Sequence, residues 1–376
     1  MRDDLLSLGV NNNGISVLGC KFKGLTGSIS AENRLVSVVG NSNTTISNSS
    51  FVDGYYGVWG QAITGPDTIR DLQIIGNTFT DIYHTPVNVV GQHRGTQVIG
   101  NTMTNNITAV ATGYVVNMTN GLNFTVADNQ ANGTFGSGAA FLSNCNGNAQ
   151  LPNRFYNNAF SVNLTSATGR AIWVQTNTSG GNDWLEVYHN SILVGINSTS
   201  TTQSGLVYVG PLLASTTQSI NRFVLQNNSI GAYSTATTGL TPANLGSIWL
   251  HAAYLLDTTV FKASNNNWYF PTAARYGYLN NPATTYATLA AFQGASAGNE
   301  LNTLQVDPQY TSSTDLRPSP ASLLGNAGTP IPGITTDLAG NGRSLVSPTI
   351  GAYEVQQSAN NSNLLRLLSP AQLQQG

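Results

Sequence analysis

The sequence predicts an all-β protein built as a parallel β-helix, a solenoid in which every rung contributes two or three short strands. Three observations lead to this prediction. A unit of 24 to 38 residues recurs along the chain, apolar residues alternate at strand spacing within each unit, and Gly, Asn, Ser and Thr take the place of most charged residues. One complete unit lies between Asp71 and Asn101.

The composition supports an ordered chain and excludes two classes of partner. Only 8% of the 376 residues are charged, but 40% are hydrophobic, so the chain can bury a large core. A net charge of −2 provides no basic surface for nucleic acid and no polybasic patch for a membrane. No apolar run approaches the ~20 residues of a membrane span. We therefore expect neither nucleic-acid binding nor membrane insertion.

The units align on a column of small polar residues, mostly Asn. Asn tolerates the left-handed conformation at a bend, and its amide can bond to the Asn of the next rung. A chance repeat of an abundant residue is the alternative, but the apolar positions on both sides keep the same register. The predicted asparagine ladder consists of Asn77, Asn101, Asn129, Asn158, Asn190, Asn228 and Asn266, preceded by Cys20 and Ser49.

An apolar column follows two residues after the ladder and should stack inside the coil. Its members are Phe22, Phe51, Phe79, Met103, Ala131, Phe160, Ile192, Ile230 and Trp268. A second strand follows in each unit, and the corner between the two strands lengthens along the chain. Cys20 and Cys145 would lie about four rungs apart, roughly 19 Å at ~4.8 Å per rung, so we expect two free, buried thiols.

The pattern divides the chain into three parts. Residues 1–281 are predicted to form the rungs, residues 282–355 a cap over the open strand edges at the C-terminal end, and residues 356–376 a tail. Within the cap, Thr284–Gln293 is the best candidate for a helix, because Tyr286, Leu289 and Phe292 have helical spacing.

The C-terminal third carries motifs that resemble a known family. They are Tyr286-x-x-Leu289-x-x-Phe292, Asp307-Pro308-x-Tyr310, Asp315-Leu316-x-Pro318, Thr336-Asp337-Leu338-x-Gly340 and Ile350-Gly351-Ala352-x-Glu354, with Val187–Ile192 (VYHNSI) as a rung motif. In this order they resemble the closing segment of secreted right-handed parallel β-helix repeat proteins of Bacteroidetes-type bacteria. The resemblance implies a right-handed coil with the pectate-lyase-like β-helix superfold and an extracellular or cell-surface location. An export signal would then lie outside this sequence.

The best enzyme-like group of residues is the pair Asp53 and Asp81, which should be neighbours on consecutive rungs, with His84 nearby. Two close carboxylates could share a proton, bind Ca²⁺ or flank a glycosidic bond. Asp is also a common turn residue that bonds to the local backbone, and we favour this interpretation. We assign no catalytic residue, no metal site and no cofactor.

Other candidates are weaker. His93 and Arg94 should lie solvated in a loop, and His189 and His251 should be structural. Exposed aromatic residues could form a stacking surface for sugars, although several should point into the core. They are Tyr55, Tyr56, Trp59, Trp173, Trp184, Trp249, Trp268, Tyr269, Tyr276 and Tyr278. We find no Thr-x-Thr array in register of the kind that binds ice.

These observations favour a non-enzymatic structural or adhesive module of an exported bacterial surface protein. An open first rung and the apolar residues Leu364, Leu365, Leu367 and Leu368 suggest that copies could associate head to tail into filaments. The alternative is a β-helix protein that binds polysaccharides or degrades them as a lyase or hydrolase.

Overall fold

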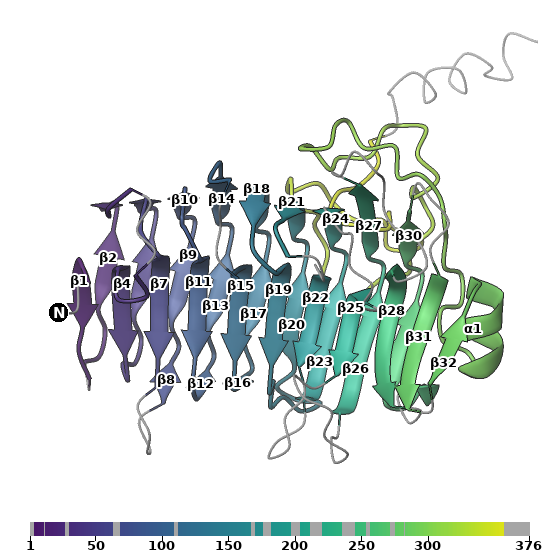
Figure 1. Ribbon diagram of the computed structural model, residues 1–376, viewed down its shortest axis with the longest axis horizontal. Helices are drawn as coiled ribbons and strands as arrows, with labels where there is room; N and C mark the ends of the chain where they lie inside the picture. The colour runs from purple at the N-terminus through teal and green to yellow at the C-terminus, as the bar shows by residue number, and fades with distance from the viewer. Residues whose placement is uncertain are drawn as a thin grey trace, which may run out of the picture.

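Successive turns of the chain add strands to three long sheets, and this arrangement confirms the predicted parallel β-helix (Figure 1). The computed structural model describes residues 4–10, 12–26, 30–62, 68–108, 112–166, 170–175, 182–196, 204–210, 220–234, 245–252, 256–270, 275–281 and 283–356. Two of the sheets have nine strands each, in agreement with about nine rungs. All pairs between rungs are parallel, and only the final pair, β31 with β32, is antiparallel.

We label the three long sheets A, C and D. In each rung the chain passes first through sheet C, then through sheet D and then through sheet A. Sheet C contains β2 (Ser16–Leu18), β5 (Thr45–Ser47), β9 (Gln73–Ile75), β13 (Gln97–Ile99), β17 (Thr125–Ala127), β20 (Asn153–Tyr156), β23 (Asn182–Tyr188), β26 (Ile220–Gln226) and β29 (Phe261–Ser264). Sheet D contains β3 (Lys21–Lys23), β6 (Ser50–Val52), β10 (Thr78–Thr80), β14 (Thr102–Asn105), β18 (Gln130–Phe135), β21 (Ala159–Leu164), β24 (Ser191–Ile196), β27 (Ser229–Ser234) and β30 (Asn267–Tyr269).

Sheet A is the longest. It contains β1 (Leu6–Leu8), β4 (Arg34–Val39), β7 (Tyr56–Gln61), β11 (Thr85–Val90), β15 (Tyr114–Thr119), β19 (Gly138–Ser143), β22 (Arg170–Gln175), β25 (Ser204–Gly210), β28 (Leu245–Ala252), β31 (Arg275–Asn281) and β32 (Thr284–Tyr286). A short sheet B lies at the corner between sheets A and C and contains β8 (Ile69–Arg70), β12 (His93–Arg94) and β16 (Gly121–Leu122).

The interior of the coil is one continuous apolar core. The predicted apolar column is buried in it from Phe51 to Trp268, whereas Phe22 in the first rung is only partly buried. Its aromatic members stack from rung to rung, with ring centroids 5.1 Å apart for Phe22 and Phe51 and 4.7 Å for Phe51 and Phe79. Burying each large side chain contributes about 2 kcal/mol.

The asparagine ladder is confirmed. From Asn77 to Asn228, each side-chain amide donates to the Oδ1 of the next Asn at 2.9–3.1 Å. The backbone N–H of each rung donates to the same oxygen. The ladder ends where the backbone N–H of Asn266 donates to the hydroxyl of Thr303 at 3.3 Å. Since the ladder is buried, it satisfies backbone groups that no water reaches.

The left-handed residue at this corner differs from the prediction. It is the residue before each ladder position, not the Asn itself. In this corner column, Gly occupies three of the first four rungs and polar residues the later ones; its members are Gly19, Asn48, Gly76, Gly100, Asp128, Asn157, His189, Asn227 and Asn265. This conformation turns the chain from sheet C into sheet D and leaves the following Asn free to point inward.

Residues 284–304 lie at the C-terminal end of the coil. The predicted helix occupies only part of its expected range, because Thr284–Tyr286 pairs as β32 and the helix α1 spans Leu289–Ala295. Thr288 caps the helix by accepting a hydrogen bond from Ala291 N–H at 3.2 Å, and Phe292 is buried against the core. Leu301 and Leu304 then pair in parallel with the last rung.

Residues 307–355, which we call the strap, run along the side of the coil instead of over its end (Figure 1). Leu316, Ala352 and Tyr353 pack on Ala159 and Leu193 of sheet D, and a second apolar cluster joins the strap to sheet C. The corner column supplies polar contacts, because the side-chain amides of Asn157, Asn227 and Asn265 donate to backbone carbonyls of the strap at 2.6–3.0 Å.

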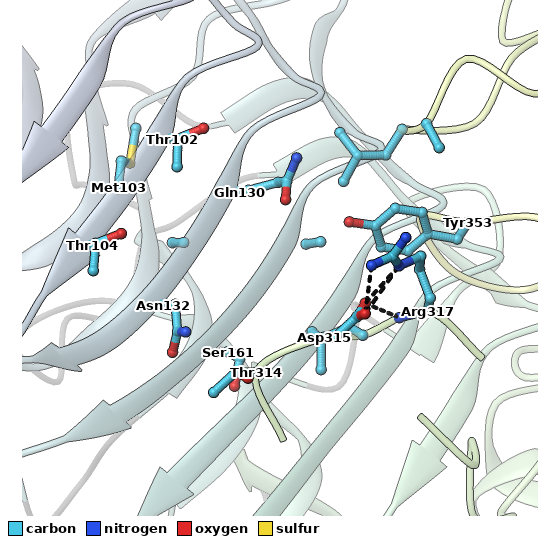
Figure 2. Close-up of a pocket in the computed structure, with 15 residues that line it drawn as sticks. Thr102, Met103, Thr104, Gln130, Asn132, Ser161, Thr314, Asp315, Arg317 and Tyr353 are labelled. Atoms are coloured by element: carbon cyan, nitrogen blue, oxygen red, sulfur yellow. Dashed lines mark hydrogen bonds and ion pairs between the residues drawn. The ribbon is translucent and has the colours of Figure 1, made fainter. Parts of the chain in front are cut away.

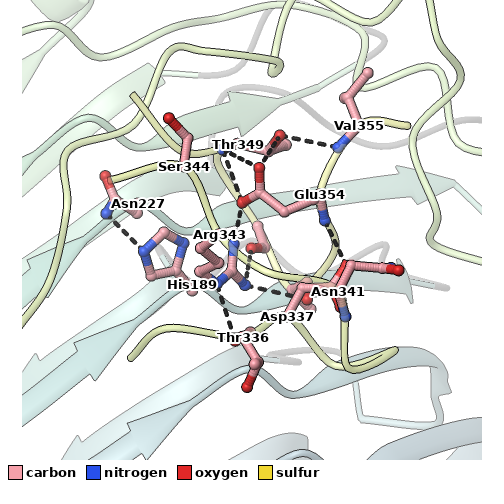
Figure 3. A network of polar contacts seen from close by, with 12 residues as sticks. His189, Asn227, Thr336, Asp337, Asn341, Arg343, Ser344, Thr349, Glu354 and Val355 are labelled. Carbon is pink, nitrogen blue, oxygen red and sulfur yellow. Dashed lines mark hydrogen bonds and ion pairs between the residues drawn. The ribbon is translucent and has the colours of Figure 1, made fainter. Parts of the chain in front are cut away.

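Arg343 is the central polar anchor of the strap (Figure 3). It is buried and donates to Glu354 at 2.8 Å and to Asn157 Oδ1 at 2.8 Å. His189 lies beside this network, and its Nε2 accepts a hydrogen bond from the side-chain amide of Asn227 at 2.9 Å. Burial lowers the pKa of His189 well below its usual value, so this histidine is neutral and structural.

Two further expectations can be compared with the structure. Cys20 and Cys145 are both free, but Cys20 is exposed because the first rung has no strand beyond it among the described residues. No helix in the described ranges is long and apolar enough to cross a membrane. Leu364, Leu365, Leu367 and Leu368 lie outside the described residues.

The ladder yields the first prediction. The Asn158→Ala substitution removes the amide that links Asn129 to Asn190. In the preceding rung, the backbone N–H of Asn129 loses its acceptor and the backbone carbonyl of Val126 loses a donor. Each such group costs about 1–3 kcal/mol. We expect the free energy of unfolding, measured by urea denaturation, to fall by at least about 3 kcal/mol.

The exposed Asn146 is a matched control for this substitution. Asn146→Ala should change the free energy of unfolding by less than about 0.5 kcal/mol. Equal stabilities of the two variants would contradict the role given to the ladder.

Candidate functional site

The outer face of sheet A carries a continuous row of aromatic side chains. Side chains along each strand of sheet A point alternately into the core and outward. Ile172 and Val207, for example, lie opposite each other and point inward, and the residue after each of them points outward. The outward residues of β19, β22, β25 and β28 are directly opposite one another. Together with one residue from β15, they form the aromatic stripe: Tyr114, Phe141, Trp173, Tyr208 and Trp249. Trp249 is only 7% exposed, and the other four rings are half-buried.

The rings of the stripe hold one another in place. Tyr114 stacks on Phe141 with centroids 5.0 Å apart, and Tyr208 stacks on Trp249 at 4.1 Å. Trp173 lies between these two pairs and meets both edge-on. Gly138 lies opposite Tyr114 and makes room for its ring, because a Cβ at this glycine would lie 3.2 Å from Tyr114. The stripe is therefore a rigid surface before any ligand arrives.

Arg170 is inserted into the stripe as a half-buried cation. Its guanidinium carbon lies 3.9 Å from the ring centre of Trp173 and 3.7 Å from that of Tyr208. Burial lowers the pKa of Arg170, but arginine remains charged at neutral pH. The rings replace part of the solvation that the cation has lost. Arg170 thereby adds a second contact between two rings that already meet edge-on.

A smaller aromatic cluster lies on the same face near the first rungs. Tyr56 meets Trp59 edge-on at 4.4 Å, and the guanidinium of Arg34 lies 4.4 Å from the Trp59 ring. The ring of His84 stacks on Tyr55 at 4.8 Å. Burial lowers the pKa of His84 to about 4, so its imidazole is neutral at pH 7.

The structure places Asp53 and Asp81 in turns. Both residues have a left-handed backbone, at φ 59° and 55°, and they follow β6 and β10 at the same place in consecutive rungs. Asp53 accepts a hydrogen bond from Thr26 at 3.0 Å, and Asp81 accepts one from the backbone of Asn106 at 2.8 Å. The left-handed turn positions agree with the favoured interpretation, but both contacts join neighbouring rungs instead of the local backbone. Among the described residues, no group of three acidic, His or Cys side chains could hold a metal ion.

The structure places several residues elsewhere than the sequence analysis predicted. Trp268 belongs to the core, and Trp184 lies on sheet C at a distance from the stripe. His93 is not solvated, because it belongs to β12 and is only 1% exposed; its Nδ1 contacts Thr96 Oγ1 at 3.0 Å.

The sequence analysis expected no Thr-x-Thr array in register, and this expectation is wrong for one pair of strands. Thr78 and Thr80 lie opposite Thr102 and Thr104 on sheet D.

The prediction from sequence found Trp173 and Trp249 but missed Tyr114, Phe141, Tyr208 and Arg170. The missing information was the register of sheet A. When its strands are aligned on their buried residues, Phe141, Trp173, Tyr208 and Trp249 fall into one column. Side chains that share a column lie ~4.8 Å apart from rung to rung.

Comparison with known proteins gives no further guide to the site. The chain matches no protein-family model, and no curated protein is similar to it in sequence.

The buried histidines predict a pH-dependent stability. Burial lowers the pKa of His93 to about 3 and that of His84 to about 4, whereas both are near 6.5 in an unfolded chain. Below pH 6.5 the unfolded chain therefore binds more protons than the folded one, and folding becomes less favourable as the pH falls. We expect the free energy of unfolding to be at least about 3 kcal/mol lower at pH 4 than at pH 7.

Two variants separate this effect from other titrating groups. His93→Asn should reduce the loss between pH 7 and pH 4 by at least about 2 kcal/mol. Phe124→Leu loosens the contact between Phe124 and His93 without removing a titrating group, and should lower the stability equally at both pH values. An unchanged pH dependence in His93→Asn would contradict the assignment.

Proposed function

We propose that this chain is the adhesive, carbohydrate-binding part of an exported bacterial surface protein. The observation that carries the proposal is the aromatic stripe on sheet A. Sugar rings present an apolar face of C–H groups that stacks on the negative face of an aromatic ring. A stripe that spans five rungs, with neighbouring strands ~4.8 Å apart, offers several such surfaces to one extended polysaccharide chain.

Polar residues along the same face would complement the stacking. The aromatic column continues toward the first rungs as Asn117 and Asn88, whose side chains are hydrogen-bonded at 2.6 Å. Asn88 is only 2% exposed, so the half-buried Asn117 is the one of the two that can offer its amide to a ligand. Amide groups can donate to and accept from the hydroxyl groups of a sugar. The strands of sheet A contain no Asp or Glu, so they offer stacking surfaces and amides and no carboxylate pair of the glycosidase type. This favours binding over turnover.

The location outside the cell rests on the motifs of the C-terminal third. Their order resembles secreted β-helix proteins of Bacteroidetes-type bacteria, in which such coils serve as surface or adhesion modules. Several motif residues have structural roles in the strap, such as the burial of Leu316 and the pairing of Glu354 with Arg343. Docking of the strap on the coil is therefore enough to explain why these motif residues are present. The support for an adhesive role comes from the aromatic stripe.

The proposal is tested by removing rings from the stripe. A Trp173→Ala/Tyr208→Ala double variant should bind its polysaccharide at least tenfold more weakly than the unmodified chain, because each stacking contact contributes about 1 kcal/mol. Binding can be measured on a glycan array and then by calorimetry with the best ligand. Trp184→Ala, which removes a half-buried Trp from sheet C, should bind like the unmodified chain.

Equal binding by all three proteins would contradict the stripe as the site. The same samples test the enzymatic alternative, because a lyase or hydrolase would release new chain ends, and Asp53→Asn and Asp81→Asn would abolish that release if the pair were catalytic.

Association of copies end to end is a second candidate function. The strands β1, β2 and β3 pair on one side only within the described residues, and Leu5, Leu18 and Leu25 near this edge are 52%, 65% and 69% exposed. An open edge with apolar side chains favours pairing with another chain. Light scattering after gel filtration should therefore show a mass that rises with protein concentration.

A charge at the edge should suppress this association. Leu18→Glu is expected to remain monomeric at concentrations at which the unmodified chain assembles. Leu345→Glu is the matched control, because Leu345 is 80% exposed on the strap, away from the edge. A monomeric unmodified chain at high concentration would rule out end-to-end assembly.

A further inference from the structure

A second hollow, separate from the aromatic stripe, lies where the strap begins to cover sheet D (Figure 2). It has a volume of about 440 Å³, which is within the range of small-molecule sites in proteins. Its floor is the outer face of β14 and β18, and its wall is formed by three parts of the strap around Asp315, Leu338 and Tyr353. We call it the strap groove.

The floor of the strap groove is a regular array of hydroxyl and amide groups. Thr102 lies opposite Gln130, and Thr104 lies opposite Asn132 in the register of sheet D. All four side chains point away from the core and are at least partly exposed. Each one can both donate and accept a hydrogen bond. They therefore suit a ligand whose surface is made of hydroxyl groups, which also donate and accept.

The wall is held in position before any ligand binds. Leu316 is 2% exposed in the apolar cluster between strap and coil, and it fixes its two neighbours, Asp315 and Arg317. These form a two-bond ion pair across the groove wall, with N–O distances of 2.6 and 2.8 Å. The Ser161 hydroxyl donates to the backbone carbonyl of Ser313 and ties this part of the strap to β21. Such a preformed site loses little entropy on binding.

The charges of the wall cancel within the groove. Asp315 and Arg317 neutralise each other, and within the described part of the chain no other charged side chain lines the hollow. A uronate or sulfate group would have to compete with Asp315 for the guanidinium, and an ammonium group would have to compete with Arg317 for the carboxylate. The groove thus favours uncharged ligands.

The strap also closes the groove on one side. Toward the C-terminal rungs, the strap covers the small outward residues Ala159 and Ser191 of sheet D. Toward the first rungs, the hydroxyl array continues with Thr78 and Thr80 on β10, where the strap does not reach. A chain lying along the array would therefore end against the strap.

We propose that the strap groove binds the terminal sugars of a neutral polysaccharide, with the rest of the chain lying along β14 and β10. This site is independent of the stripe on sheet A, because it lies on another sheet and uses hydrogen bonds instead of stacking. A module with both sites would contact polysaccharides in two ways, along the chain at the stripe and at the chain end in the groove.

The experiment uses trisaccharides and hexasaccharides of β-1,4-linked glucose, mannose and xylose, titrated into the full chain by calorimetry. At least one neutral series should bind, with similar dissociation constants for both lengths, because a trisaccharide already spans β18, β14 and β10 at ~4.8 Å per strand. A trisaccharide of glucuronate should bind at least tenfold more weakly. Thr104→Trp, which fills the groove, and Asn132→Ala should each weaken binding of the neutral trisaccharide at least tenfold.

Val52→Trp is the matched control, because it adds the same ring to sheet D two rungs from Thr104. It should bind the neutral trisaccharide like the unmodified chain. The Trp173→Ala/Tyr208→Ala variant of the stripe should retain trisaccharide binding at the groove, and adding Thr104→Trp to that variant should abolish the binding that remains. The proposal is overturned if no neutral trisaccharide binds, if Thr104→Trp binds normally, or if the hexasaccharides bind in proportion to their length. Loss of all binding in the stripe variant alone would overturn the groove and leave the stripe as the site.

Discussion

The side-chain amide of the ladder Asn determines how one rung sits on the next. Its Oδ1 accepts two hydrogen bonds from the previous rung, and its Nδ2 donates both to the next Asn and to a backbone carbonyl. A slip of one residue would break all of these bonds inside a core that no water can enter. The fixed register is what allows every other column to form, including the stacked Phe residues inside and the aromatic stripe outside. Without it, the outward residues of sheet A would not share a surface.

The corner column connects the ladder to the strap. Each ladder Asn follows a residue with a left-handed backbone, and Gly or Asn can meet this requirement with little strain. In the first rungs most of these residues are Gly, which offers no side chain to a neighbour. In the later rungs they are Asn157, His189, Asn227 and Asn265, and the three Asn amides bond to the strap. One conformational requirement is thus met by different residues according to what lies outside the coil.

The sequence was sufficient to predict the β-helix, the ladder and the stacked apolar column, because these depend on contacts that repeat in every unit. It was not sufficient for features that occur once or in only a few rungs. His93 follows a loop in sequence but belongs to the short strand β12, which pairs with two neighbouring rungs. The strap has few apolar residues in any periodic order, so its path along the side of the coil could not be read from a pattern. The aromatic stripe is intermediate. An aromatic residue recurs in successive rungs, but these residues can be recognised as one column only when the register of sheet A is known.

The rungs also change along the coil, and this change places both candidate sites. Strands of sheets C and D grow from three residues in β2 and β3 to seven in β23 and six in β24. The longer strands give the strap a wide surface, and small residues such as Ala159 and Ser191 let its backbone approach closely. Since the strap occupies sheets C and D there, the outer face of sheet A is the one that can present large aromatic rings. The strap groove lies on sheet D at the boundary between the strands that the strap covers and those that it leaves uncovered. Both sites are thus consequences of where the coil becomes wide enough to hold the strap.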